Sequence, residues 1–370
     1  MAELRSIGLA HGLDVVGVAS AERFTSTRHD LESRKARGLH GGMAFTYRSP
    51  ERSTDPSRTV ADARSLVVGA RSYWRADPPE DQPARPAATV ARYARVDHYA
   101  PLRAALAAIA ARLRDEGWRA LVVADDNALV DRAAAQRAGL GWFGKNANLL
   151  LPGRGSWFVL GSVITDAPLD DQVDTAPVAD GCGSCIRCLE GCPTGAIVAP
   201  GVVDARRCLA WLLQAEGDFP QEFRSALGDR IYGCDECQEV CPPNRRATRR
   251  AAEDPASSGE GEQARVDVLD LLVASDEELL DRHGRWYIPR RDPRFLRRNG
   301  LVVLGNVGRA ADAGVTDALR RYLASPDPLL RGHAVWAARR LGRVDLLSAV
   351  REDPDPSVRD ELTQPVEVRR

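Results

Sequence analysis

All eight cysteines of this 370-residue chain lie between Cys182 and Cys241, and this clustering is the strongest constraint on its fold. The first four have the spacing Cys-x2-Cys-x2-Cys-x3-Cys-Pro, which is typical of bacterial ferredoxins and their iron–sulfur clusters. A second run, Cys234-x2-Cys237-x3-Cys241-Pro, has no first cysteine nearby, and Cys208 is the only thiol left to supply it. Eight thiolates make two sets of four, so the sequence predicts two 4Fe-4S clusters.

In two-cluster ferredoxins the fourth cysteine of a run binds the other cluster, and we expect the same exchange here. Disulfides are disfavoured in a reducing cytosol. Structural zinc sites usually pair two Cys-x2-Cys units, whereas three ligands within seven residues fit a cubane better. The Cys-x3-Cys-x2-Cys motif of radical-SAM enzymes does not occur. The predicted ligand sets are Cys182, Cys185, Cys188 and Cys241 for one cluster, and Cys208, Cys234, Cys237 and Cys192 for the other.

The composition indicates a soluble, cytoplasmic protein with two or three domains. Hydrophobic residues make up 44% and charged residues 28% of the chain, and single cores rarely grow past about 250–300 residues. A net charge of -1 excludes a uniformly basic nucleic-acid-binding surface but allows a local basic face. No apolar run approaches the roughly 20 residues that cross a bilayer, and the N-terminus does not resemble a signal peptide. We therefore expect a monomer that does not bind membranes.

Strand-like and helix-like segments alternate over the first part of the chain. Apolar runs at Val15–Val18, Leu66–Gly69, Leu121–Val123 and Trp157–Leu160 are typical of strands, and Tyr99–Glu116 has a helical pattern. This alternation predicts a layered α/β or α+β domain.

The last hundred residues repeat a short pattern. Asp-Pro pairs at 292, 327 and 355, separated by 35 and 28 residues, are each followed by an arginine. Such a period suits helix-pair units of the HEAT type, which bury their apolar faces on one another. The predicted organisation is a catalytic α/β domain over 1–170, a ferredoxin-like domain over 171–247, a linker over 248–263 and HEAT-like repeats over 264–370.

A glycine-rich turn precedes the cysteines. Residues 139–146 follow a helical pattern, whereas dinucleotide-binding and P-loop glycine motifs follow a strand and open a helix. These glycines would let the backbone approach a bulky ligand closely, and a purely structural turn is the alternative. Lys35 and Lys145 are the only lysines among 51 basic residues, which indicates that the turn needs an ammonium group, and a chance remnant is the alternative. The candidate ligand-binding residues are Gly139, Gly141, Trp142, Gly144, Lys145 and Asn146.

Asp125, at the end of an expected strand, is the candidate acid. The alternative is an ordinary helix N-cap, a role that Asp126 or Asn127 could fill equally well. His283 has Trp286 where a corrinoid-binding histidine motif would have glycine, so we expect a structural histidine there. We expect no histidine to bind a cofactor metal.

These motifs resemble the epoxyqueuosine reductases. The resemblance implies reduction of epoxyqueuosine to queuosine at the wobble position of tRNA, the last step of queuosine biosynthesis, with cobalamin and two 4Fe-4S clusters. It also implies a fold similar to corrinoid reductive dehalogenases, in which the first domain binds cobalamin. The residues that carry the resemblance are Ala138–Asn146, Gly155–Phe158, Leu160–Gly161, Cys182–Ile197, Asp204–Cys208, Arg230–Pro242, Arg297–Arg298 and His333–Trp336.

The same resemblance implies roles for single residues. Asp125 matches the family's proposed proton donor, and the 139–146 turn matches the segment that contacts the cofactor. Electrons would come from a flavodoxin or a ferredoxin. The chain departs from the family at Ala128, where proline is common, and at Ala100, which stands where the family commonly has histidine. The role of that histidine is therefore not carried over.

Five arginines within nine residues predict a contact with the tRNA anticodon stem-loop, because guanidinium groups stack on unpaired bases and bind phosphates. A solvated helix face is the alternative. Two other functions stay open: a corrinoid reductase of a small molecule, and a non-catalytic 4Fe-4S electron-transfer protein on a HEAT scaffold. The arginines are Arg290, Arg291, Arg294, Arg297 and Arg298.

Overall fold

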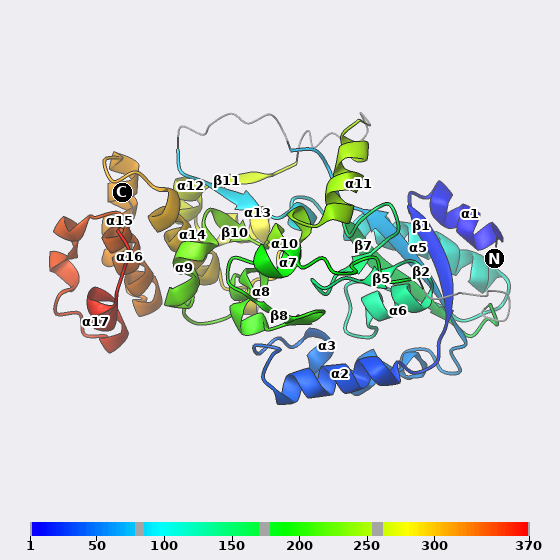
Figure 1. Cartoon of the computed structure of the whole chain (residues 1–370). Helices are drawn as coiled ribbons and strands as arrows, with labels where there is room; N and C mark the ends of the chain where they lie inside the picture. Colours follow the sequence, from blue (N-terminus) through cyan, green and yellow to red (C-terminus); the bar gives the residue numbers. More distant parts are fainter. Residues whose placement is uncertain (1, 78–84, 170–177, 254–261, 369–370) are drawn as a thin grey trace. The chain divides into compact units, whose positions relative to one another are not determined.

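The computed structural model describes residues 2–77, 85–169, 178–253 and 262–368, and it divides into two compact units (Figure 1). Within these ranges, no helix combines the length and apolarity needed to cross a membrane. Residues 254–261 of the predicted linker lie outside the described residues. The first unit comprises Met1–Ala76, Val96–Arg206 and Asp235–Glu260, and the second comprises Asp77–Arg95, Arg207–Cys234 and Gly261–Arg370.

An antiparallel sheet of four strands forms the centre of the first unit. Its strand order is β1-β2-β7-β4, and every neighbouring pair is antiparallel. The unit is therefore α+β, and the α/β alternative is wrong. Each strand overlaps a predicted one, which confirms the strand predictions. The strands are β1 (Val15–Ser20), β2 (Ser65–Ser72), β4 (Ala120–Val123) and β7 (Phe158–Thr165).

Helices cover both faces of this sheet. α1 (Ala2–Ala10) and α5 (Tyr99–Asp115) pack on one face, and α5 confirms the predicted helix. Gly69 and Gly161 are cross-strand partners, and a Cβ on either would lie 3.1 or 2.8 Å from the Leu106 side chain of α5. The glycine pair therefore lets α5 lie close to the sheet. α6 (Asp131–Arg137) packs against β1, β2 and β7.

Shorter elements complete the first unit. α10 leads directly into α11, which ends at Ala252, so the first residues of the predicted linker are helical. The remaining elements are α2 (Thr25–Ala36), α3 (Phe45–Arg48), α4 (Pro50–Ser53), β5 (Trp142–Phe143), β6 (Leu149–Leu150), α7 (Arg187–Glu190), β8 (Ile197–Ala199), β9 (Val202–Val203), α10 (Glu236–Glu239) and α11 (Pro242–Ala252).

The second unit contains a small mixed sheet that the sequence did not reveal. β3 (Ala87–Val90) lies between β10 (Arg230–Tyr232), which is parallel to it, and β11 (Arg265–Asp267), which is antiparallel. These strands have three or four residues each, too few for a recognisable alternation of apolar and polar residues. The chain thus enters the second unit at β3 and then returns to the first.

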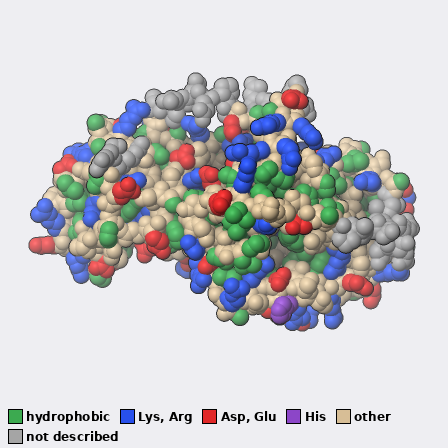
Figure 2. Space-filling model, in the orientation of Figure 1, with side chains coloured by type: hydrophobic (Ala, Val, Ile, Leu, Met, Phe, Trp, Pro, Cys, Tyr) green, Lys and Arg blue, Asp and Glu red, His purple; other side chains and the backbone are tan. Residues whose placement is uncertain are grey.

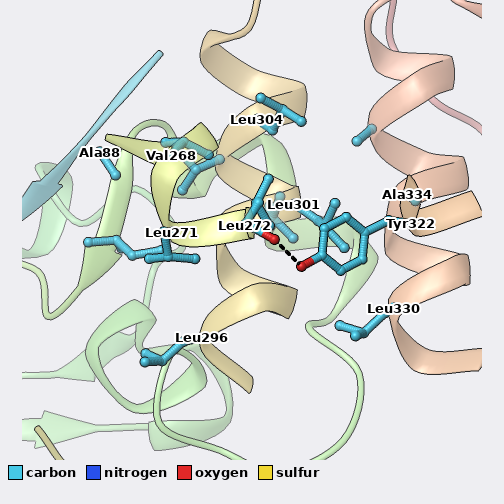
Figure 3. Packing of buried hydrophobic residues seen from close by; sticks show 14 of the residues in the cluster. Ala88, Val268, Leu271, Leu272, Leu296, Leu301, Leu304, Tyr322, Leu330 and Ala334 are labelled. Carbon is cyan, nitrogen blue, oxygen red and sulfur yellow. Dashed lines mark hydrogen bonds between the residues drawn. The ribbon is translucent and has the colours of Figure 1, made fainter. Parts of the chain in front are cut away.

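Helices form the rest of the second unit. Asp327 and Asp355 cap α16 and α17 by accepting hydrogen bonds from backbone N–H groups, so the repeated Asp-Pro pattern marks helix starts. Tyr322 packs in the apolar core of this unit, and its hydroxyl donates to the carbonyl oxygen of Leu272 at 2.6 Å (Figure 3). The helices are α8 (Leu209–Leu212), α9 (Gln221–Leu227), α12 (Val268–Val273), α13 (Asp276–His283), α14 (Arg294–Val307), α15 (Ala313–Leu323), α16 (Pro328–Arg340) and α17 (Pro356–Thr363).

Candidate active site

Four cysteines of the first unit share one electrostatic environment. Burial raises the pKa of the Cys241 thiol to about 11, and Cys182, Cys188 and Cys185 add to the rise. Burial also raises the pKa of Cys188, and Cys182 and Cys185 again act in the same direction. Thiolates raise one another's pKa only at short range. The structure thus brings Cys241 from the second cysteine run to the three cysteines that begin the first.

The donor set fits an iron–sulfur cluster better than a single metal ion. None of the eight cysteines forms a disulfide. Within the described ranges, no three His, Cys, Asp or Glu side chains converge closely enough to hold one metal ion. A 4Fe-4S cubane needs a different arrangement, because each of its four irons binds one thiolate. The four cysteine sulfurs therefore lie farther apart than they would around one metal ion. Four neighbouring but separated thiols are suited to that arrangement.

Backbone N–H groups around Cys192 favour the thiolate form of its side chain. Burial alone would raise the pKa of its thiol, but hydrogen bonds from the N–H groups of Thr194 and Ala196 outweigh burial and lower the pKa. The Ala196 nitrogen lies 3.2 Å from Sγ. Of the second predicted ligand set, Cys192 and Cys237 belong to the first unit, and Cys208 and Cys234 belong to the second.

The polar residues of the glycine-rich turn contact the cysteine segments. The Lys145 ammonium donates to the carbonyl oxygen of Gly183 at 2.6 Å, between the first two cysteines. Asn146 is 5% exposed, and its Nδ2 donates to the Cys237 carbonyl oxygen at 3.2 Å. Its Oδ1 accepts a hydrogen bond from the Asn148 nitrogen. The side chain of Asn146 therefore holds the second cysteine run against the turn.

The three glycines of the turn are required by the chain itself. Gly139 has a φ of +70° just after α6, the conformation that glycine commonly adopts at a helix C-terminus. A Cβ at Gly141 would lie 2.0 Å from the Leu150 carbonyl oxygen, and one at Gly144 would lie 2.3 Å from the Leu150 Cδ1 atom. Strand β6 thus fills the space that a ligand was predicted to occupy, and these contacts support the structural alternative for Gly141 and Gly144.

Two side chains of the turn retain unused hydrogen-bond donors. Trp142 is 8% exposed, and its indole Nε1 has no hydrogen-bond partner among the described residues. Lys145 has three N–H donors and directs one of them to Gly183. A buried aromatic donor and an ammonium group on one turn fit a large polar cofactor that has amide and phosphate oxygens.

Asp125 does not cap a helix. α6 begins at Asp131 with Val130 as its N-cap, so the prediction of an Asp or Asn cap at 125–127 is wrong. Asp126 instead accepts from the Ala128 nitrogen at 2.8 Å and closes a local turn. Asp125 has a φ of +55°, and its carboxyl has no hydrogen bond within the described part of the chain. An acid held in this rare conformation without a structural partner is a candidate for chemistry.

The surroundings of Asp125 favour its protonated form. The residue reaches solvent on one side, yet the protein atoms around its carboxyl raise the pKa. Arg103 lowers the pKa, while Asp126 and Asp97 raise it. The desolvating and acidic neighbours outweigh the arginine.

Asp131 and Tyr99 were missed by sequence reasoning. Burial raises the pKa of Asp131 well above its ordinary value, and Asp125 raises it further. Burial followed by Asp125 and Asp131 also raises the pKa of Tyr99, so its phenol stays neutral. The available signal was an acid at the first position of a helix, six residues beyond Asp125. The site is a group of two carboxyls and one phenol.

The five arginines predicted to contact tRNA do not form one surface. Arg298 is fully buried and donates to the carbonyl oxygens of Leu212, Ala215 and Gly217, so its prediction as an RNA contact is corrected to a core residue. Arg290 is exposed and pairs with Glu216. The other three are Arg291, which is exposed, and Arg294 and Arg297, which are partly buried and paired with Asp292 and Asp276.

His283 lies outside this site. It is 2% exposed and stacks on Trp286 at 4.4 Å between ring centroids. Burial, followed by Arg282 and Arg285, lowers its pKa to about 4. The sequence predicted a structural histidine here, and its stacked, buried position agrees with that prediction.

The cysteine segment defines the class of protein to which this chain belongs. The sequence matches the family described as a 4Fe-4S double cluster binding domain over residues 181–244, which contain all eight cysteines. The chain is therefore a double-cluster iron–sulfur protein, and the prediction of two 4Fe-4S clusters is confirmed.

Whole-chain comparisons give the family. An epoxyqueuosine reductase of Bacillus anthracis is 32% identical over 90% of this chain and 86% of its own length. One from Xanthomonas campestris is 35% identical over 92% of this chain and 96% of its own. A crystal structure of an epoxyqueuosine reductase with an epoxyqueuosine-modified tRNA-Tyr stem loop covers 98% of this chain and 96% of its own, with a TM-score of 0.85 and 30% identity. The chain belongs to the epoxyqueuosine reductase family of oxidoreductases, which confirms the predicted resemblance.

Proposed function

We propose that this chain reduces epoxyqueuosine to queuosine at the wobble position of tRNA, the last step of queuosine biosynthesis. The observation that carries the proposal is the relative solved with an epoxyqueuosine-modified stem loop, which matches nearly the whole chain with a TM-score of 0.85. A match confined to the cysteine domain would support electron transfer alone. Because the match extends over both units, it supports the same substrate and the same reaction.

The proposed cofactors are cobalamin and the two 4Fe-4S clusters. When bound, they supply the two electrons that remove the epoxide oxygen as water and leave an alkene, while two protons are taken up. Cobalamin would be held by the indole N–H of Trp142 and the two remaining N–H donors of Lys145, on a turn shaped by Gly139, Gly141, Gly144 and Asn146. One cluster would be held by Cys182, Cys185, Cys188 and Cys241, and the other by Cys192, Cys208, Cys234 and Cys237.

Asp125 is the proposed proton donor to the departing oxygen. Its carboxyl has a raised pKa and no structural hydrogen bond among the described residues, so a proton can be held there and then given up. Asp125 also raises the pKa of the second carboxyl, Asp131, and two interacting carboxyls do not both ionise readily. A positioned general acid typically contributes about 10²–10⁴-fold to a rate.

The proposed domain roles follow the sequence. Residues 1–170 would form the cobalamin-binding domain, 171–247 the ferredoxin-like domain, and 264–370 HEAT-like repeats after a linker. The exposed Arg290 and Arg291 of the second unit, with Arg294 and Arg297, would contribute to binding the tRNA anticodon stem-loop. The proposed electron donor is a flavodoxin or a ferredoxin.

The decisive experiment adds cob(II)alamin to the protein with both clusters reconstituted under anaerobic conditions. We expect tight binding and an altered cobalt EPR signal, followed by conversion of epoxyqueuosine in tRNA when an electron donor is supplied. Intact clusters without cobalamin binding would instead identify a non-catalytic electron-transfer protein. Cobalamin binding without conversion of modified tRNA would favour a corrinoid reductase of a small molecule.

A further inference from the structure

Helix α11 presents four arginines to solvent on one side. Arg245, Arg246, Arg249 and Arg250 are all exposed, and their spacing places them within one arc of the helix. Figure 2 shows Lys and Arg side chains gathered over α11. None of the four forms an ion pair with a described residue. We call these four residues the α11 basic face.

The α11 basic face is fixed to a cysteine segment. α11 begins immediately after Cys241, and Asn244 in its first turn is 1% exposed. The Asn244 Nδ2 donates to the Gln238 carbonyl oxygen and to the Ser156 hydroxyl, both at 2.9 Å. Its Oδ1 accepts from the Ser156 nitrogen at 2.6 Å. The four charges are therefore held at a fixed place beside a predicted cluster ligand.

An exposed apolar side chain lies in a cysteine segment that is linked to α11 through α7 and α10. Ile186, between the second and third cysteines of the first run, is 46% exposed. α7, which begins at the next residue, packs against α10, and α10 leads into α11. Transient complexes of redox proteins bury small interfaces in which charge steers the encounter. An exposed aliphatic side chain near steering charges fits this kind of interface.

We propose that the α11 basic face, with Ile186, is the docking site of an acidic one-electron donor protein of the flavodoxin or ferredoxin class. Four cations that form no ion pair with a described residue complement an acidic surface, and they lie next to the segment that would hold a cluster. In the transfer, the reduced donor loses one electron and an oxidised 4Fe-4S cluster gains it, without movement of a proton or a covalent bond.

The test uses full-length protein with its clusters and reduced flavodoxin as the probe. The variant Arg246→Glu/Arg249→Glu reverses two charges that form no ion pair with a described residue. The control Arg5→Glu/Arg37→Glu makes the same change at exposed positions elsewhere in the first unit. We expect the α11 variant to lose about 10-fold or more in affinity by calorimetry, and its rate of cluster reduction by flavodoxin to fall in parallel. The loss should shrink at high ionic strength. Dithionite, a small reductant, should reduce both variants equally.

The outcomes separate the possible occupants. Donor affinity and reduction rate equal to those of the control variant would overturn the proposal. A loss of tRNA affinity with unchanged donor binding would also overturn it and assign the face to RNA. If the double glutamate variant loses its clusters, Arg246→Gln/Arg249→Gln should still weaken donor binding. The docking proposal rests on the proposed function only because that function requires an electron donor. Donor binding is measured without tRNA or cobalamin, so the docking proposal and the proposed function can fail separately.

Discussion

At the scale of single residues, Asp125 stands out because its carboxyl accepts no hydrogen bond from a described residue. Val130 is the N-cap of α6, and Asp126 accepts the hydrogen bond of the local turn. Neither role involves the carboxyl of Asp125. The sequence predicted this residue as an acid but gave even weight to a cap. Only the positive φ and the position of α6 separate the two interpretations, and neither is encoded in residue type.

We predict that Asp125→Asn retains cluster and cobalamin binding but lowers turnover of epoxyqueuosine tRNA by about 10²–10⁴-fold, because the amide cannot donate the proton. The measurement is single-turnover conversion, followed by mass spectrometry of the nucleoside. Asp126→Asn is the matched control, since an asparagine oxygen still accepts the turn hydrogen bond. Turnover of Asp125→Asn equal to that of the control would remove Asp125 from the mechanism.

Arg298 shows why a run of arginines does not by itself define a surface. Burial lowers the pKa of its guanidinium to about 9, with a further contribution from Arg224. Three backbone carbonyls and Asn299 accept its hydrogen bonds. Sequence spacing places Arg298 beside Arg297, but only packing decides which of the two faces the core.

We expect Arg298→Leu to lower the free energy of unfolding by about 2–4 kcal/mol, because buried carbonyls and Asn299 lose a charged donor. Arg291→Ala, at an exposed position, should change it by no more than about 0.5 kcal/mol. Urea denaturation followed by tryptophan fluorescence compares the two. The assignment of Arg298 to the core would be contradicted by a stable Arg298→Leu protein that binds tRNA weakly.

At the scale of elements, long segments were predicted better than short ones. The four strands of the main sheet and helix α5 were read from their apolar patterns, and the Asp-Pro repeat located the starts of α16 and α17. The order β1-β2-β7-β4 and its antiparallel pairing were not predicted, because strand order depends on contacts between distant segments. The short β3, β10 and β11 carry too few residues to give a pattern.

The hairpin of β5 and β6 gives a test of the glycine-rich turn as an element. Gly141→Ala should destabilise the protein by about 1–3 kcal/mol, because the new methyl group meets the Leu150 carbonyl oxygen. Gly332→Ala is the same change inside α16, where the nearest atom lies 3.6 Å away, and helix propensity should stabilise it by about 0.5–1 kcal/mol. Thermal unfolding should therefore shift in opposite directions, and equal shifts would argue against the close packing of β5 on β6.

At the scale of the whole molecule, segments far apart in sequence are joined by buried polar groups as well as by apolar cores. His333 connects α16 to the segment that precedes α9: its Nδ1 donates to the Leu329 carbonyl oxygen within α16 at 2.7 Å, and its Nε2 accepts from the Phe219 nitrogen at 3.2 Å. This arrangement requires a neutral ring. The sequence marked the His333–Trp336 segment only through family resemblance, because nothing local indicates a partner more than a hundred residues away.

These buried rings predict how stability depends on pH. Burial, together with Arg224 and Arg298, lowers the pKa of His333 well below 6.5, and the pKa of His283 is lowered to about 4. The unfolded chain binds protons below about pH 6.5 that the folded chain does not, so stability is full above that pH and falls as pH drops toward about 4. For His283 the full shift corresponds to about 3 kcal/mol.

Urea denaturation across this range should show the loss in the wild-type protein. In His333→Gln the amide can make both hydrogen bonds but cannot titrate, so the dependence on pH should be shallower. In His29→Gln, at an exposed position, it should match the wild type. A His333→Gln protein with the full wild-type slope would mean that His333 does not hold the second unit together as a neutral ring.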